Sequence, residues 1–240
     1  MIASVLTLGL FGLATASPVT VQSQVTPRYP DTSKSNAFRL VIDVTDASKD
    51  FTPSIRNTYI ASIHVGAGLA LVGNIASANN ARIFYQNGTA DEYRSHQTTV
   101  ITDSGTPSFP SGFRLVAEDK GSEVASTIHL DAGPGTPGIG LNRFPEPLAF
   151  LFPDTWLACN QSIPYYQNKY FIILKHAKTT VGKGGSVDRI VPKDCAPVRL
   201  IPECTKLNDL PSGSYSSHVF AIEDRCYGDV KSVKWSEHGP

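Results

Sequence analysis

Four polar side chains are candidates for ligand binding in this sequence: His64, His129, Arg143 and Glu146. His64 and His129 fall on the polar side of segments in which polar and apolar residues alternate, so each would project from one face of a β-strand. A histidine there can act as a base or a ligand, although a hydrogen bond within the sheet accounts for it equally well. Arg143 and Glu146 lie in a loop rich in proline and glycine, where they could contact a polar ligand or form a surface ion pair. The sequence assigns no catalytic residue.

The short motifs that mark cofactor and enzyme sites are either absent from this sequence or are followed by residues that cannot complete the site. Gly133, Gly135 and Gly138 spell G-x-G-x-x-G, but a proline-rich stretch follows, so no helix can present its N-terminus to a pyrophosphate. The glycine-rich segment 182–186 lacks the spacing of a phosphate-binding loop. Neither G-x-S-x-G nor H-E-x-x-H occurs, and no pair of carboxylates marks a glycosidase. The sequence therefore predicts no cofactor and no metal, and it favours a protein without catalytic activity.

The four cysteines, Cys159, Cys195, Cys204 and Cys226, all lie in the last third of the chain. An even number of cysteines behind an export signal predicts two disulfide bonds, and the absence of C-x-x-C spacing argues against zinc. Cys195 and Cys204 flank a predicted strand, which would hold their Cα atoms roughly 25 to 30 Å apart, so they should not pair. Two pairings remain: Cys159–Cys195 with Cys204–Cys226, or Cys159–Cys204 with Cys195–Cys226. The first closes shorter loops and is preferred.

Two sequons, at Asn87 and Asn160, predict N-glycosylation on an exported chain. Asn87-Gly88 also predicts a hairpin turn, because both residues tolerate positive φ. A glycan at Asn87 would then occupy a solvated loop. The neighbouring disulfide and a strand end could hide Asn160.

The first 16 residues predict a signal peptide, because an uncharged apolar run ends in Ala14 and Ala16, the small residues that signal peptidase requires. Residues 17–36, rich in Ser, Thr, Gln and Pro, predict a disordered arm. Lys and Arg together number 21, as do Asp and Glu, so the chain lacks the basic excess of nucleic-acid-binding proteins. The sequence predicts a secreted protein with no nucleic-acid partner and no membrane association after the signal is removed.

Residues 37–240 predict a single domain of the all-β class. Phe38, Leu40, Ile42 and Val44 face one way in a two-residue repeat, and Arg39, Asp43 and Thr45 face the other, which is typical of an antiparallel sheet with one buried face. Segment 52–68 shows the same alternation. Similar segments recur along the chain, with turn residues between them and without a persuasive helix: 69–76, 81–86, 98–102, 112–118, 124–131, 148–152, 155–160, 170–175 and 197–201. We expect a two-sheet antiparallel β-sandwich of about ten strands, stapled by disulfides, with segment 133–147 as an exposed loop or a cover over a sheet edge.

Several short motifs are spread over residues 37–230: Phe38 with its strand, Thr52-Pro53, His64-x-Gly66-Ala67-Gly68, Asn87-Gly88-Thr89, the Gly-Pro-Gly-Thr-Pro-Gly loop from Gly133 to Gly138, Arg143-Phe144-Pro145, Cys159-Asn160, Cys195, Cys204 and Cys226. With these motifs the sequence resembles an uncharacterised family of small secreted proteins from filamentous fungi, known only as a domain of unknown function. The resemblance implies the same fold and an extracellular location. It brings no assigned activity.

Three functions are compatible with these features. The first is a secreted glycoprotein that acts by binding, with a cell-wall glycan or an extracellular host protein as partner. The second is a carbohydrate-active enzyme with carboxylates on a concave sheet face. The third is a structural wall component, which would carry a large exposed apolar patch. The binding protein is preferred because export, disulfides and sequons occur together without a catalytic signature.

Overall fold

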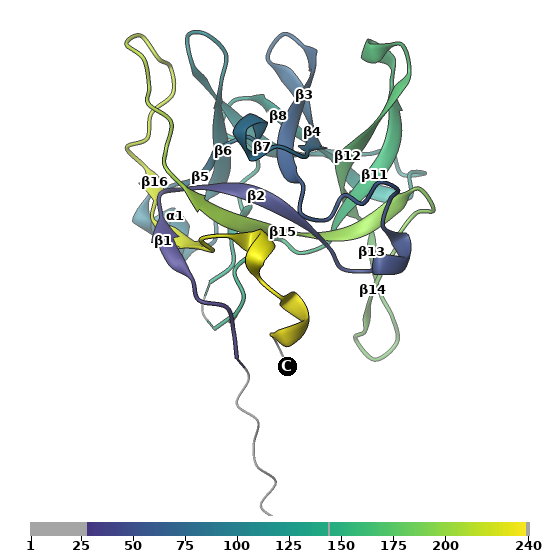
Figure 1. The fold of residues 1–240 in the computed structure, drawn as a ribbon. Coiled ribbons are helices and arrows are strands. Elements are labelled where there is room, and N and C mark those ends of the chain that lie inside the picture. The colour runs from purple at the N-terminus through teal and green to yellow at the C-terminus, as the bar shows by residue number, and fades with distance from the viewer. Residues whose placement is uncertain (1–27, 144, 239–240) are drawn as a thin grey trace, which may run out of the picture.

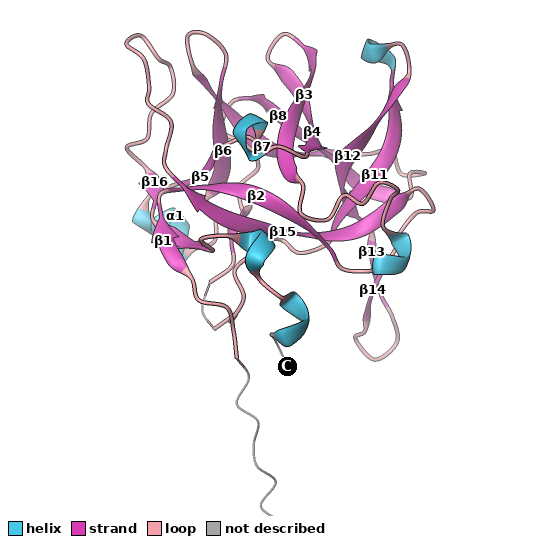
Figure 2. Ribbon diagram, viewed as in Figure 1, coloured by secondary structure: helices cyan, strands magenta, loops and turns pink. Residues whose placement is uncertain are grey.

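The computed structural model describes residues 28–143 and 145–238, and β-strands dominate the regular structure of these residues (Figures 1 and 2). The strands are β1 (Ser33–Ser35), β2 (Ala37–Val44), β3 (Tyr59–Gly66), β4 (Leu69–Ile75), β5 (Phe84–Asn87), β6 (Thr99–Ser104), β7 (Phe109–Ala117), β8 (Val124–Ala132), β9 (Gly140–Leu141), β10 (Leu151–Phe152), β11 (Trp156–Ile163), β12 (Lys169–Ala177), β13 (Thr179–Val181), β14 (Val187–Arg189), β15 (Cys195–Thr205), β16 (Ala221–Ile222) and β17 (Asp224–Cys226). Helical structure in the described residues consists of α1 (Ala90–Arg94) and the 3-10 turns Ala47–Lys49, Ala78–Asn80, Pro164–Tyr166, Val230–Ser232 and Trp235–Glu237. The prediction of an all-β fold is confirmed.

Eleven strands form one antiparallel sheet in the order β11-β15-β2-β3-β4-β12-β8-β7-β6-β5-β16. The sheet closes on itself, because β11 also pairs with β12 and β2 also pairs with β5. In Figure 1, β2 and β15 run across the front of the more upright strands, so the fold has the two layers expected of a sandwich. The layers share hydrogen bonds through β2, which pairs with β5 at Phe38 and with β3 at Val41.

The core lies between these layers and is built from the side chains that alternate along each strand. Phe38, Leu40, Ile42 and Val44 of β2 are all buried and pack with side chains of β4, β7, β8, β11, β12 and β15. Trp156, the largest fully buried side chain of the described residues, donates from Nε1 to the Leu151 carbonyl oxygen at 3.0 Å. That hydrogen bond removes the cost of burying the indole N–H.

Segment 133–138 covers a free edge of β7, as its sequence predicted. β7 pairs with β6 only as far as Gly112, and the loop then takes over: Thr136 donates its backbone N–H to the Phe113 carbonyl at 3.0 Å. The approach is so close that a Cβ on Gly112 would lie 2.0 Å from the Gly135 nitrogen. The loop supplies hydrogen-bond partners for backbone groups of β7 that another strand could otherwise pair with.

Three local expectations need correction. Ser33–Ser35 form β1, although disorder was predicted as far as Asn36, because β17 pairs with this segment from Ser33↔Cys226 to Ser35↔Asp224. Residues 1–27, which include the predicted signal peptide, lie outside the described residues. Asn87-Gly88 does not form a hairpin turn: Asn87 ends β5 between Thr99 and Ala221, and α1 follows. The strand expected over 52–68 begins only at Tyr59.

The two predicted disulfide bonds are present, as Cys159–Cys195 and Cys204–Cys226. The Cα atoms are 4.0 Å apart in the first bond and 5.1 Å in the second. This is the pairing with the shorter loops. Cys195 and Cys204 lie on the single extended strand β15, which is why they cannot bond to each other.

Candidate functional site

A concave site with a volume of about 610 Å³, which we call the main cavity, lies beside helix α1 and the loop that follows β9. Volumes of roughly 300 to 1,000 Å³ are typical of small-molecule sites. Arg143 and Glu146, two of the four candidate residues, both line it. The full lining consists of Gln86, Tyr93, Arg94, His96, Thr98, Gly138, Gly140, Leu141, Asn142, Arg143, Pro145, Glu146, Phe150, Phe152 and Asp154.

The floor of the main cavity is fixed by the buried amide of Gln86, which lies on β5. Its Oε1 accepts the backbone N–H of Leu141 at 2.7 Å, and its Nε2 donates to Thr98 Oγ1 at 2.9 Å. A side chain at position 140 would displace this network, because a Cβ there would lie 2.9 Å from both Gln86 Nε2 and Thr98 Oγ1. Gln86 therefore joins β9 to the main sheet and holds the base of the site.

The loop that carries Arg143 and Glu146 is closed by Asn142. The Asn142 amide donates to the Leu148 carbonyl at 2.6 Å and accepts the Phe150 backbone N–H at 2.7 Å. Within the loop, the Glu146 N–H donates to the Arg143 carbonyl at 3.0 Å. Asn142, at the start of the loop, thus holds the far end of the loop through two side-chain hydrogen bonds, and this preorganises the two candidate residues.

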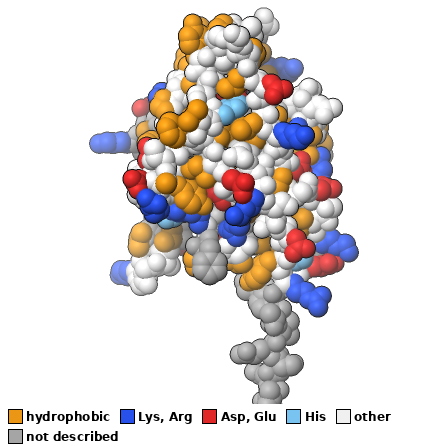
Figure 3. All heavy atoms as spheres, turned by 90° about the vertical axis from the view of Figure 1, so that its left-hand side faces the viewer, with side chains coloured by type: hydrophobic (Ala, Val, Ile, Leu, Met, Phe, Trp, Pro, Cys, Tyr) orange, Lys and Arg blue, Asp and Glu red, His pale blue; other side chains and the backbone are white. Residues whose placement is uncertain are grey.

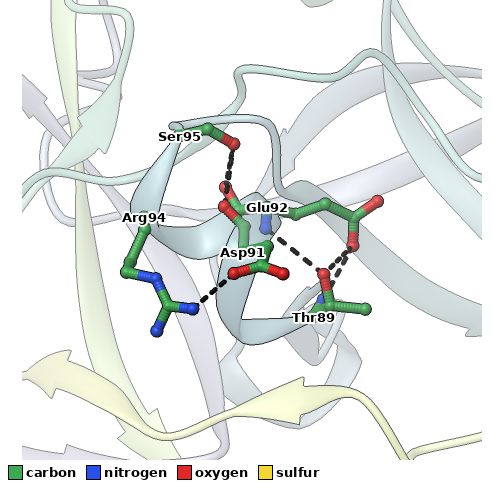
Figure 4. A network of polar contacts seen from close by, with 5 residues as sticks. All are labelled: Thr89, Asp91, Glu92, Arg94 and Ser95. Carbon is green, nitrogen blue, oxygen red and sulfur yellow. Dashed lines mark hydrogen bonds and ion pairs between the residues drawn. The ribbon is translucent and has the colours of Figure 1, made fainter.

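Helix α1 forms one wall and is capped at both ends (Figure 4). The Thr89 hydroxyl accepts the Glu92 N–H at 3.2 Å while the Glu92 carboxylate accepts the Thr89 N–H at 2.7 Å, which is a capping box. Arg94 pairs with Asp91, and the Ser95 hydroxyl donates to the Asp91 carbonyl at 2.8 Å. These contacts stabilise a five-residue helix that would be too short to persist alone.

Two of the aromatic rings that line the main cavity are each covered by an arginine. The Arg143 guanidinium lies over the Tyr93 ring at 4.4 Å, and Arg199 lies over Phe150 at 4.7 Å. Asp154 already pairs with Arg199 at 3.3 Å and with Arg189 at 3.7 Å. Phe152 is 48% exposed, so its ring remains open to a ligand at the rim.

A smaller cavity of about 380 Å³, which we call the second cavity, is lined by Lys34, Tyr93, Arg143, Glu223, Asp224 and Arg225. Asp224 is 5% exposed, and its carboxylate faces the Tyr93 hydroxyl. Burial raises the pKa of this carboxyl group, while hydrogen bonds from the Arg225 backbone N–H and the Tyr93 hydroxyl, and the charges of Arg225 and Arg143, oppose the rise. Burial and the nearby Asp224 charge raise the pKa of Tyr93. Arg225 donates to the Asn142 carbonyl at 3.1 Å and so ties the second cavity to the loop of the first.

His64 and His129 line neither cavity. The His64 ring packs edge-on against Tyr165 at 5.5 Å, near the turn between β11 and β12. His129 Nδ1 lies 3.3 Å from the Asp131 carboxylate on the same strand. The four candidates therefore do not converge: Arg143 and Glu146 share a cavity, and the two histidines make contacts within the β-structure.

The two sequons differ in exposure, and the order is the reverse of the one expected from the sequence. Asn160 is exposed on β11, although it follows the disulfide-bonded Cys159. Asn87 is half-buried between two strands, and the Thr89 of its sequon is engaged in the α1 cap. The structure thus leaves Asn160 the more accessible acceptor.

Several residues of the site carry no obvious sequence signal. Asn142, Phe152 and Asp224 follow no motif, and Asp224 lies about 70 residues after the other two. Tyr93 could have been placed on a helix, because Thr89 and Glu92 have the spacing of a capping box. In the part of the chain that the structure describes, no group of three metal-ligating side chains is found, and no helix has the length and apolarity needed to cross a membrane.

Comparison with known proteins places this fold in a family. The profile of a domain of unknown function, DUF7907, matches residues 35–204. The chain is also 55% identical over 225 residues to the antigenic protein SchS34 of Stachybotrys chartarum, a match that covers 94% of this chain and all of that protein. No solved structure matches. The chain therefore belongs to the DUF7907 family of domains of unknown function.

Proposed function

We propose that the chain is an exported glycoprotein that binds carbohydrate in the main cavity. The observation that carries this proposal is the chemistry of the cavity wall, where the exposed ring of Phe152 stands beside hydrogen-bonding groups such as Arg143 and Glu146. Sugars present an apolar C–H face and a rim of hydroxyl groups that both donate and accept. An exposed aromatic ring with polar neighbours suits both features.

Export is supported by the apolar segment at residues 1–16 and by the two disulfide bonds, which form in oxidising compartments. The similarity to a fungal antigenic protein agrees with an extracellular location. We further propose that Asn160 carries the glycan. Asn160→Gln should lower the mass of the secreted protein by one glycan, whereas Asn87→Gln should leave the mass unchanged apart from the substitution. The reverse result would refute this assignment.

A glycan array probed with the mature protein tests the proposed function, followed by calorimetric titration of any glycan retained. Phe152→Ala should weaken binding roughly tenfold, equivalent to about 1.4 kcal/mol, because the stacking surface is lost. Leu69→Ala is a matched control, since Leu69 is also 48% exposed but lines neither cavity. An empty array, or equal effects of the two substitutions, would contradict the proposal.

A carbohydrate-active enzyme is the alternative that the same cavity suggests, because Glu146 and Asp154 both line it. Asp154 is already engaged by two arginines, which favours a positioning role over proton transfer. Release of reducing ends from a bound glycan, abolished by Glu146→Gln, would identify an enzyme instead. A structural wall component is less well supported, because hydrophobic side chains on the face shown in Figure 3 are interspersed with charged ones.

A further inference from the structure

We infer that the ligand is an oligosaccharide that occupies the main cavity and the second cavity together, with the stacked Arg143–Tyr93 pair between its two parts. This inference rests on the proposed function, since it specifies the length and placement of the sugar chain.

The two cavities are adjacent because Tyr93 and Arg143 line both of them. The Arg143 guanidinium lies over the Tyr93 ring at 4.4 Å, so the two side chains form one ridge between the cavities. With volumes of about 610 and 380 Å³, each cavity falls in the range that accepts a small ligand. A chain molecule that crosses the ridge can fill both, whereas a single sugar can fill only one.

Asp224 is the feature of the second cavity that is best suited to bind a ligand hydroxyl. It lines this cavity, is 95% buried, and faces the Tyr93 hydroxyl at the ridge. Its Oδ1 accepts the Arg225 backbone N–H at 2.7 Å. A carboxylate has about four acceptor positions, so Asp224 retains capacity for a hydrogen bond from a ligand hydroxyl.

The other groups of the second cavity complete the recognition of a hydroxyl-rich chain. Lys34, Arg143 and Arg225 supply donors, while Glu223 and Asp224 supply acceptors. A unit that carries several hydroxyl groups can donate and accept at once, and this matches the mixed set of side chains. Because the lining has three cationic side chains and two carboxylates, the second cavity could also bind a sugar that carries a carboxylate.

Two series of oligosaccharides, each of two to six units, test the inference by calorimetric titration of the full mature protein. One series is neutral, β-1,4-linked N-acetylglucosamine, and the other is acidic, α-1,4-linked galacturonate. In the series that binds, we expect the affinity to rise about tenfold between two and four units and then to level off. Asp224→Asn and Lys34→Ala should each weaken the longer oligomers about tenfold more than the shortest one. Lys34 is exposed, so its variant remains informative if Asp224→Asn fails to fold.

The outcomes separate the two proposals. If short and long oligomers bind equally, or if Lys34→Ala weakens all lengths by the same factor, the second cavity is not part of the site and this inference is refuted while the proposed function stands. If neither series nor the glycan array gives binding, the proposed function fails and the inference fails with it. Equal effects of Leu69→Ala and Lys34→Ala would also refute the inference.

Discussion

The disulfide Cys204–Cys226 should stabilise both the fold and the second cavity, and the second disulfide of the chain offers a matched control. Cys226 lies two residues after Asp224 on β17, whereas Cys159–Cys195 joins β11 to β15 and involves no residue that lines either candidate cavity. The perturbation is the double substitution Cys204→Ala with Cys226→Ala, compared with Cys159→Ala and Cys195→Ala.

The expected loss of stability follows from the loops that the bonds close, 22 and 36 residues in sequence separation. The chain-entropy relation gives about 3.4 kcal/mol for Cys204–Cys226 and about 3.8 kcal/mol for Cys159–Cys195 at 25 °C. On entropy alone, the control should therefore lose slightly more stability. The difference between the variants lies in where the structure loosens, because only Cys204–Cys226 fastens β17 and its partner β1.

Guanidinium unfolding measures the global loss, and amide hydrogen exchange measures the local one. The Cys204/Cys226 variant should lose protection at Ser33–Ser35 and Asp224–Cys226, and it should bind long oligosaccharides more weakly. The control should keep protection there despite its lower stability. A Cys204/Cys226 variant within about 1 kcal/mol of the oxidised wild type, or one that retains protection in β17, would refute the reasoning.

Three further predictions concern the walls of the site. Thr89→Ala removes half of the capping box of α1 and should cost about 1 kcal/mol in the free energy of unfolding, measured by urea unfolding; Thr89→Ser should restore most of it, and equal losses would contradict the capping role. Gly140→Ala places a Cβ 2.9 Å from Gln86 Nε2 and should lower the free energy of unfolding by about 1 to 3 kcal/mol. It should also weaken ligand binding, as measured by titration. An unchanged melting temperature would contradict the close packing. Burial raises the pKa of Asp224 above its usual 3.8, so its contribution to folding stability is fully present below pH 3.8 and is lost as the pH rises through the raised value. Wild type should therefore lose stability relative to Asp224→Asn over that interval in urea titrations, and a constant difference would contradict the shift.

The strands and the core could be predicted because their signal is local. Phe38, Leu40, Ile42 and Val44 follow a two-residue repeat, and all four are buried as the period predicts; Val41, on the opposite side of β2, is buried in a second cluster. Trp156 lies in segment 155–160, which was expected to be a strand, and is 1% exposed. The disulfide pairing could be narrowed because one strand separates Cys195 from Cys204. These inferences needed only the geometry of an extended chain.

The candidate site was predictable only in part, because it depends on contacts between distant segments. Arg143 and Glu146 were recognised from their loop, but Asn142, which closes that loop, has no signal beyond its side-chain type. Asp224 becomes a candidate only through its burial in the wall of the second cavity, which no sequence pattern reveals. Conversely, His64 and His129 were placed correctly on strands, but alternation cannot tell whether two strand residues meet.

The pairing of β2 with β15 determines when this chain can finish folding. Their register runs from Ala37↔Thr205 to Val44↔Val198, so the second strand from the N-terminus waits for a partner about 160 residues later. Closing so large a loop before its contacts form is slow. A ribosome must therefore deliver most of the polypeptide before the layers can meet, and until then the apolar face of β2 is exposed to chaperones and to other nascent chains.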